Sequence, residues 1–167
     1  MKKAVIVVLA MALVMSIGIG SAFAANSMEA GTIGININTS ADQLVSGKYF
    51  ISNSMALLAG LGIGANGGDA KGTDMFLLVG ARKYLSTNDF APFAGGKLEY
   101  SSTNDSCIKN MSLSGEFGAE YFLHKQFSLE GSVGFGYSSH EETAPLTPLK
   151  TTLIGTKRAG LSANFYF

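Results

Sequence analysis

Residues 111 to 123 read MSLSGEFGAEYFL and alternate between two kinds of side chain. The odd positions are mostly bulky and apolar, whereas the even positions are Ser, Gly, Glu and one Phe. Side chains of a strand point alternately to its two faces, so this period of two indicates a β-strand with one apolar face. Residues 127 to 138 repeat the pattern after a gap of only His124, Lys125 and Gln126, which predicts a hairpin.

The same period recurs along the chain after residue 25 and predicts eight strands. No window there carries apolar residues at the spacing of about 3.6 that an amphipathic helix needs. The strands are expected at residues 30 to 38, 43 to 51, 55 to 64, 74 to 85, 90 to 101, 111 to 123, 127 to 138 and 153 to 167. Most of them reach the length of about 9 to 11 residues that a tilted strand needs to cross a bilayer.

The connections between these strands alternate between short and long. Short turns are expected at residues 52 to 54, 86 to 89 and 124 to 126, a short loop near 39 to 42, and longer polar loops at 65 to 73, 102 to 110 and 139 to 152. Short periplasmic turns, longer outside loops and an even strand count are typical of outer-membrane barrels. The predicted fold is therefore all-β, an eight-stranded antiparallel up-and-down transmembrane β-barrel.

The composition is unusual for a water-soluble protein. Charged residues make up 14% of the chain and Gly accounts for 21 of 167 residues, against about a quarter and about 7% in typical soluble domains. Lys2 and Lys3 precede an apolar run that closes on Ala22-Phe23-Ala24, which predicts a cleaved secretory signal peptide. The run is short for a retained anchor, which needs about 20 residues. The expected division is a signal peptide at 1–24 and a barrel domain at 25–167, exported in a Gram-negative bacterium.

Charge and cysteine content argue against a nucleic-acid partner and against an internal disulfide. Removing Lys2 and Lys3 leaves 12 − 2 = 10 basic residues against 12 acidic ones, so the mature chain is nearly neutral. The sequence contains no basic patch, so it does not predict a nucleic-acid partner. The single Cys107 has no partner for an internal disulfide.

Charged residues within the expected strands share the face opposite the bulky apolar side chains. A wall that meets lipid must be apolar on its outside, so the charged face is expected to line the lumen. A lone charge in this narrow interior would be costly, whereas paired charges among Ser, Thr, Asn and Gly would fill it as a hydrogen-bonded plug. The expected lumen charge network consists of Lys48, Arg82, Lys97, Arg158, Glu99, Glu116, Glu120 and Glu130. Lys83 and Lys157 are expected to point outward near strand ends.

The chain ends on a strongly amphipathic strand. Apolar Leu161, Ala163, Phe165 and Phe167 alternate with Gly160, Ser162, Asn164 and Tyr166. A final strand of this kind that stops on Phe resembles the signal recognised by the outer-membrane barrel assembly machinery. We assign this C-terminal assembly signal to Leu161, Phe165, Tyr166 and Phe167.

Residues 47 to 57, GKYFISNSMAL, carry the most specific local pattern. With Lys48 inserted, they resemble the strand-turn-strand consensus Gly-Tyr-Phe-aliphatic-x-Asp/Asn-x-aliphatic-Ala of small outer-membrane β-barrels of the OmpX and OmpA transmembrane-domain type. Residues 81 to 85 and 119 to 123 resemble the same element at the next two short turns. The resemblance covers the whole mature chain and implies architecture more than activity, since related barrels serve as anchors, adhesion or defence proteins, small channels and lipid-modifying enzymes.

These features predict a non-enzymatic, integral outer-membrane protein with a plugged lumen, exposed at the cell surface in a structural or adhesive role. The expected partners are outer-membrane lipid and lipopolysaccharide, the barrel assembly machinery, and an extracellular partner bound through loop 139–152, which Pro145 and Pro148 stiffen. No cofactor, metal site or catalytic residue is expected, because His124 and His140 fall at opposite ends of the barrel.

Three other functions stay open from the sequence. The many Gly residues leave room inside the barrel, which favours a small porin-like pore or a hydrophobic-ligand channel. A lipid-modifying enzyme would need a Ser and a His close together, which neither His offers. A periplasmic barrel that binds a ligand would lack the membrane altogether.

Overall fold

The computed structural model describes residues 27–38, 45–66, 72–103, 108–142 and 149–167, apart from the side chains of 64–66, 72–73 and 157–158. All statements below concern these parts of the chain; the expected signal peptide and Cys107 lie outside them. Eight strands are present: β1 (Ile33–Asn38), β2 (Val45–Ser52), β3 (Met55–Asn66), β4 (Gly72–Tyr84), β5 (Phe90–Thr103), β6 (Ile108–His124), β7 (Phe127–Glu142) and β8 (Leu149–Tyr166).

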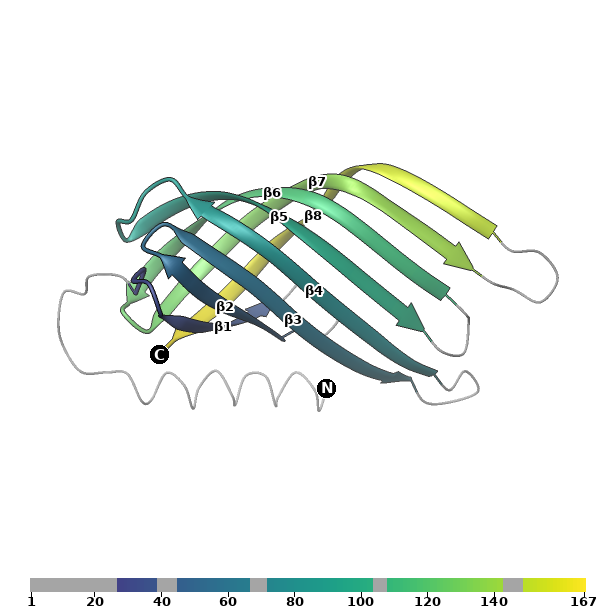
Figure 1. Ribbon diagram of the computed structural model, residues 1–167, viewed down its shortest axis with the longest axis horizontal. Coiled ribbons are helices and arrows are strands. Elements are labelled where there is room, and N and C mark those ends of the chain that lie inside the picture. The colour runs from purple at the N-terminus through teal and green to yellow at the C-terminus, as the bar shows by residue number, and fades with distance from the viewer. Residues whose placement is uncertain (1–26, 39–44, 67–71, 104–107, 143–148) are drawn as a thin grey trace.

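Each strand pairs antiparallel with the next, and β8 pairs with β1 to close the barrel (Figure 1). The seam runs from the pair Gly34 and Tyr166 to the pair Asn38 and Ser162. The predicted fold, an eight-stranded antiparallel up-and-down barrel, is therefore confirmed. Among the described residues there is no helix that is long and apolar enough to cross a membrane.

The two ends of the barrel differ. At one end, which we call the turn end, short turns join β2 to β3, β4 to β5 and β6 to β7, and the C-terminus lies beside them at the left of Figure 1. At the other end, the loop end, the strands from β3 to β8 reach further than the sequence pattern indicates. β3 continues to Asn66, β5 to Thr103 and β7 to Glu142.

This extension corrects the expected long loops. The loop predicted at 139–152 is largely strand, because Ser139 to Glu142 pair with residues of β8 from Leu149 onward. The connections shorten to residues 67–71, 104–107 and 143–148. Backbone pairing needs only N–H and C=O groups, so a ladder can continue where the side chains no longer alternate. A period of two detects a strand only where its two faces meet different surroundings.

A second correction concerns the alternation along β8. Gly134 of β7 pairs with Lys157, whereas Ser132, two residues away, pairs with Gly160. β8 therefore carries one extra residue, a β-bulge, which shifts the faces of its two halves relative to each other. The uninterrupted alternation expected over 153 to 167 is wrong at this point. Lys157 and Arg158 lie at the bulge, and their side chains are outside the described part of the chain.

The outward face is a continuous apolar belt. Large apolar side chains that point outward are exposed on every strand; examples are Ile35, Tyr49, Leu61, Val79, Leu98, Phe117, Val133 and Leu161. Among the described outward positions, charged side chains occur only near strand ends: Lys83 at the turn end and Lys109, Glu141 and Lys150 at the loop end. The inside holds buried polar and charged side chains together with a smaller set of apolar ones.

Candidate functional site: the closed lumen

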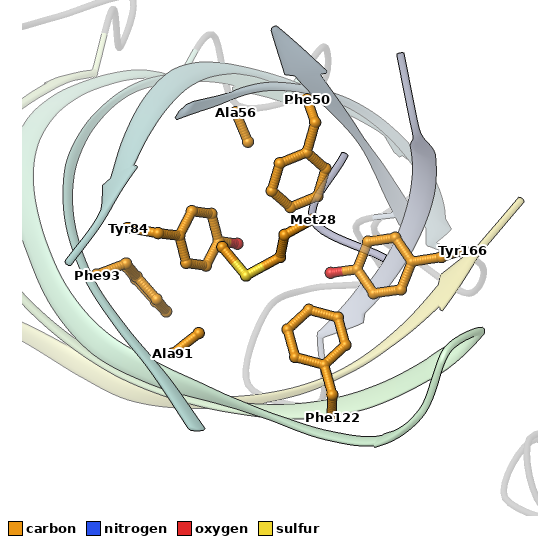
Figure 2. Close-up of a cluster of buried hydrophobic side chains, with 8 residues drawn as sticks. All are labelled: Met28, Phe50, Ala56, Tyr84, Ala91, Phe93, Phe122 and Tyr166. Carbon is orange, nitrogen blue, oxygen red and sulfur yellow. The ribbon is translucent and has the colours of Figure 1, made fainter. Parts of the chain in front are cut away.

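The lumen is filled at the turn end by a cluster that we call the apolar base. Its members come from six strands and from the segment before β1, and all are at most 5% exposed. They are Met28, Phe50, Ala56, Tyr84, Ala91, Phe93, Phe122 and Tyr166. Aromatic rings stack at centroid distances of 5.5 Å for Phe50 with Tyr84 and for Phe122 with Tyr166. Figure 2 shows Met28 in the middle of the ring that the other side chains form.

The segment before β1 holds Met28 in this position. Ser27 donates a hydrogen bond from Oγ to the Lys125 carbonyl in the β6–β7 turn. Gly31 donates from its backbone N–H to the Phe50 carbonyl at 2.8 Å. Gly31 has φ +96°, a backbone conformation that L side chains rarely adopt, so glycine is favoured where the chain turns back. The segment therefore crosses the turn end of the barrel before entering β1.

Six charged side chains lie above the base and form an alternating line, which we call the charge chain. Lys97 Nζ lies 2.6 Å from Glu116 Oε2, and Glu116 Oε1 accepts a hydrogen bond from Arg82 Nε. Arg82 Nη1 contacts Glu130 at 2.6 Å. Lys48 Nζ then lies 3.3 Å from Glu130 and 2.8 Å from Glu120. The order Lys97, Glu116, Arg82, Glu130, Lys48, Glu120 thus contains three positive and three negative groups with every neighbour of opposite sign.

Neutral polar groups complete the coordination of the last pair. Glu120 accepts hydrogen bonds from Tyr84 Oη at 2.7 Å and Asn164 Nδ2 at 3.1 Å, and from the hydroxyls of Ser128 and Tyr166. Lys48 Nζ lies within 3.1 Å of the hydroxyl oxygens of both tyrosines. A buried charge is tolerated only when its partners replace the lost water. The two tyrosines therefore join the apolar base to the charge chain, with their rings in one and their hydroxyls in the other.

The structure brings together six of the eight residues that the sequence placed in the network. Glu99, the seventh, is on the same inward face but only half-buried, and it forms no ion pair with any side chain that the structure describes. It lies opposite Ser112, whose buried hydroxyl has no hydrogen-bond partner there. The eighth, Arg158, falls at the bulge, and its side chain is outside the described residues.

Several residues of the site were not expected from the sequence. Tyr84 stands two positions after Arg82 and Asn164 two positions before Tyr166, so both share the inward face, and this spacing was the available signal. No such spacing pointed to Met28, because it precedes the first strand. Tyr166, assigned to the assembly signal, is buried in the lumen, whereas Leu161 and Phe167 of the same set are exposed. The Phe165 ring packs at a tilt against Phe127, with a centroid distance of 5.1 Å.

Inward glycines make room for the large side chains. A Cβ on Gly95 would lie 2.5 Å from the Ala81 carbonyl oxygen and 2.9 Å from Arg82 Cγ. A Cβ on Gly118 would lie 2.3 Å from the Gly131 carbonyl oxygen and 2.7 Å from Phe93 Cζ. These positions lie in the wall beside the charge chain and the base, which explains part of the high glycine content.

Solvent access along the lumen changes from one end to the other. Inward side chains at the turn end are buried, whereas Lys97, Glu99 and Ser101 on β5 and Ser138 and His140 on β7 are partly accessible. In a closed barrel, an inward side chain can be accessible only if solvent enters the lumen. Side chains therefore fill the lumen at the turn end, and solvent reaches inward side chains further up. The described residues contain no group of three or more His, Cys, Asp or Glu side chains suited to a metal ion.

Comparison with known proteins shows the fold and no closer relationship. No protein-family profile and no curated protein matches the chain. Among solved structures, the N-terminal β-barrel domain of Pseudomonas aeruginosa OprF is 15% identical with a TM-score of 0.54, covering 83% of this chain and 98% of that one. The P. aeruginosa outer-membrane protein OprG is 13% identical with a TM-score of 0.53, covering 83% and 97%.

A third solved structure gives the same picture. The outer-membrane protein AlkL, determined in DMPC lipid bilayers, is 13% identical with a TM-score of 0.53 and covers 89% of this chain and 94% of that one. All three are small outer-membrane barrels. The expected resemblance to this class is therefore confirmed as a likeness of fold.

Proposed function

We propose that this chain is an integral outer-membrane protein of a Gram-negative bacterium, a non-enzymatic barrel that does not conduct and that presents its loop end at the cell surface in a structural or adhesive role. The observation that carries the proposal is the double closure of the lumen, in which the apolar base and the charge chain lie one above the other. Both consist of closely packed side chains that are buried except for Lys97 at the upper end of the charge chain, and this packing supports a lumen that water does not cross.

The outward belt supports the membrane location. In water, so many exposed apolar side chains in one continuous surface would lead to aggregation. In a bilayer these side chains contact the acyl chains of lipids, which are as apolar as they are. The closed barrel also forms the backbone hydrogen bonds that lipid cannot provide. Placing the turn end in the periplasm and the loop end outside follows the general pattern of these barrels. Outer-membrane lipid would then contact the belt, with lipopolysaccharide at its outer edge.

The closing seam supports recognition of the last strand by the barrel assembly machinery. Phe167 donates from its backbone N–H to the Ile33 carbonyl at 2.9 Å, so the end of the chain is tied to the start of β1. Leu161 and Phe167 remain exposed on the outside. A machine that holds the last strand by these side chains would release it when β1 pairs with it. Contact with an extracellular partner through the β7–β8 connection stays a proposal, since residues 143–148 lie outside the described chain.

The test is conductance across a planar bilayer, combined with gel migration before and after heating to verify a folded barrel. We expect the unmodified protein to show no stable unitary conductance. The apolar base and the charge chain block the same path one after the other. Met28→Ala, which opens only the base, and Glu120→Ala, which opens only the charge chain, are therefore each expected to leave the current near baseline. The double variant is expected to conduct. A large, stable unitary conductance in the unmodified, folded protein would refute the closure.

A small pore or hydrophobic-ligand channel is the second candidate. It is favoured by the partly accessible inward side chains Glu99, Ser101 and Ser138 in the upper lumen. Uptake of a small solute into vesicles that contain the protein, faster than into empty vesicles, would support this candidate against the first.

A further inference from the structure

A cleft of about 560 Å³ lies at the turn end, between two neighbouring turns of the barrel. Ser54 of the β2–β3 turn forms one side, and residues 83–88 at the end of β4 and in the following turn form the rest. Lys83 and Leu85 are exposed outward positions, so the cleft opens away from the lumen. It is separate from the charge chain.

The lining carries the chemistry of an anion site. Lys83 provides an ammonium group, Ser54, Ser86 and Thr87 provide hydroxyls, and Asn88 provides an amide, while no lining residue is a carboxylate. Lys83 Nζ donates to Ser54 Oγ at 2.6 Å and forms no ion pair among the described residues. An ammonium has three N–H donors, so this bond leaves donors for a ligand. One cation with several neutral donors matches a phosphate group.

Backbone hydrogen bonds hold the two sides of the cleft in place. Tyr84 donates from its N–H to the Ser54 carbonyl at 2.8 Å, which ties the β4 end to the neighbouring turn. Leu85 donates to the Pro92 carbonyl at 2.7 Å, and Asn88 donates from its N–H to Ser86 Oγ at 3.2 Å. A site whose parts are already positioned loses less entropy on binding than one that must assemble.

The cleft also lies where lipid headgroups would be. Exposed Leu85 lines it, and exposed apolar Met55 and Phe90 begin the strands that follow the two turns. Lys83 is the charged outward residue of β4 at the edge of the belt. We propose that the cleft binds the phosphate group of a phospholipid in the periplasmic leaflet, with the acyl chains against the belt. This inference rests on the proposed membrane location. Free inorganic phosphate has the same binding chemistry, but it lacks the acyl chains.

The experiment uses the mature protein in nanodiscs of phosphatidylethanolamine and phosphatidylglycerol, transferred to a maltoside detergent. Native mass spectrometry then measures the phospholipid that stays bound. Lys83→Gln is expected to weaken retention about tenfold, since loss of a charge-assisted hydrogen bond of ~1.4 kcal/mol changes the binding constant by that factor. Lys83→Arg is expected to retain the lipid, and Ser54→Ala to weaken retention in the same direction. Lys150→Gln, which removes an outward lysine at the loop end, is the matched control and is expected to change nothing.

A second measurement separates the two sources of phosphate. Inorganic phosphate is titrated into the lipid-free protein in the same detergent and followed by phosphorus NMR, and we expect much weaker binding than that of the phospholipid. Equal retention in Lys83→Gln and Lys150→Gln would overturn the site while leaving the membrane proposal intact. Inorganic phosphate that binds as tightly as the lipid would overturn the assignment to a phospholipid. Failure of the unmodified protein to enter bilayers would overturn both proposals.

Discussion

Each buried charge in the lumen is compensated by its immediate neighbours. Glu120, which is fully buried, is surrounded by one ammonium, three hydroxyls and one amide, about as many donors as a carboxylate can accept. Removing one member of such a set leaves a charge without a partner, and this costs about 3 to 5 kcal/mol. The buried charges also fix the register of the strands. A slip of one residue would move Lys48 and Glu120 from the lumen to the outward apolar face.

Close packing beside these charges predicts unequal effects for two glycines on one strand. Gly118→Ala places a methyl group against the Gly131 carbonyl oxygen and Phe93, and we expect the free energy of unfolding to fall by about 1 to 3 kcal/mol. Gly115→Ala is the control, since its nearest atoms lie 3.9 Å from the added Cβ. That change is expected to be neutral or to stabilise by up to about 1 kcal/mol. Urea unfolding in lipid vesicles measures both, and equal losses would contradict the packing argument.

The segment that precedes β1 behaves as part of the barrel rather than as a free terminus. Its bonds reach the β6–β7 turn through Ser27, the β2–β3 turn through Ala30 and β2 through Gly31. As a result, Met28 lies in the middle of the circle that the other side chains of the apolar base form (Figure 2). Closure of the turn end therefore depends on residues that belong to no strand.

This arrangement predicts slow access to position 28. In a Cys107→Ser background, Met28→Cys is expected to react with a polar maleimide more slowly than Asn53→Cys at the neighbouring turn. Adding Gly31→Ala strains a left-handed position by about 1 to 2 kcal/mol and is expected to speed labelling of Cys at 28 roughly tenfold. The rate is measured by mass spectrometry of the folded protein. Labelling at 28 as fast as at 53 would show that the segment does not close the barrel.

The whole molecule is a closed barrel whose described inward side chains are buried at the turn end and partly accessible towards the loop end. The apolar belt surrounds it, and the outward charges stay near the strand ends, with Lys83 below and Lys109, Glu141 and Lys150 above. β6, β7 and β8 have 17, 16 and 18 residues, whereas about 9 to 11 suffice to cross a bilayer. On the proposed location, these three strands rise beyond the membrane at the loop end.

Orientation follows from this asymmetry and can be measured in intact cells. In the Cys107→Ser background, Lys150→Cys at the loop end is expected to react with a membrane-impermeant maleimide. Lys125→Cys in the β6–β7 turn is expected to stay unlabelled until the outer membrane is opened. Both lysines are exposed, so the comparison is matched in accessibility. The opposite labelling pattern would reverse the proposed topology, and labelling of neither site would argue against surface exposure.

Much of the fold could be predicted because it depends on local alternation. Strand positions, the short turns and the inward face of Lys48, Arg82, Glu116, Glu120 and Glu130 follow from a period of two and from the polarity of each face. The upper strand ends could not be predicted, since the ladder continues to Thr103 and Ile108 where the side chains no longer alternate between apolar and polar. The β8 bulge also has no local signature, because it is defined only by which residue of β7 lies opposite.

The sequence by itself determined the number of strands, their two faces and the set of side chains that shares the inside. Only the tertiary structure decided which charges meet. The contacts of Lys48 with Glu120 and Glu130 join residues 72 and 82 positions apart in the chain, across a lumen whose closure also brings Met28 into the base. The face of a residue depends on its neighbours along the strand, whereas its partner depends on barrel closure and strand register, which are properties of the whole chain.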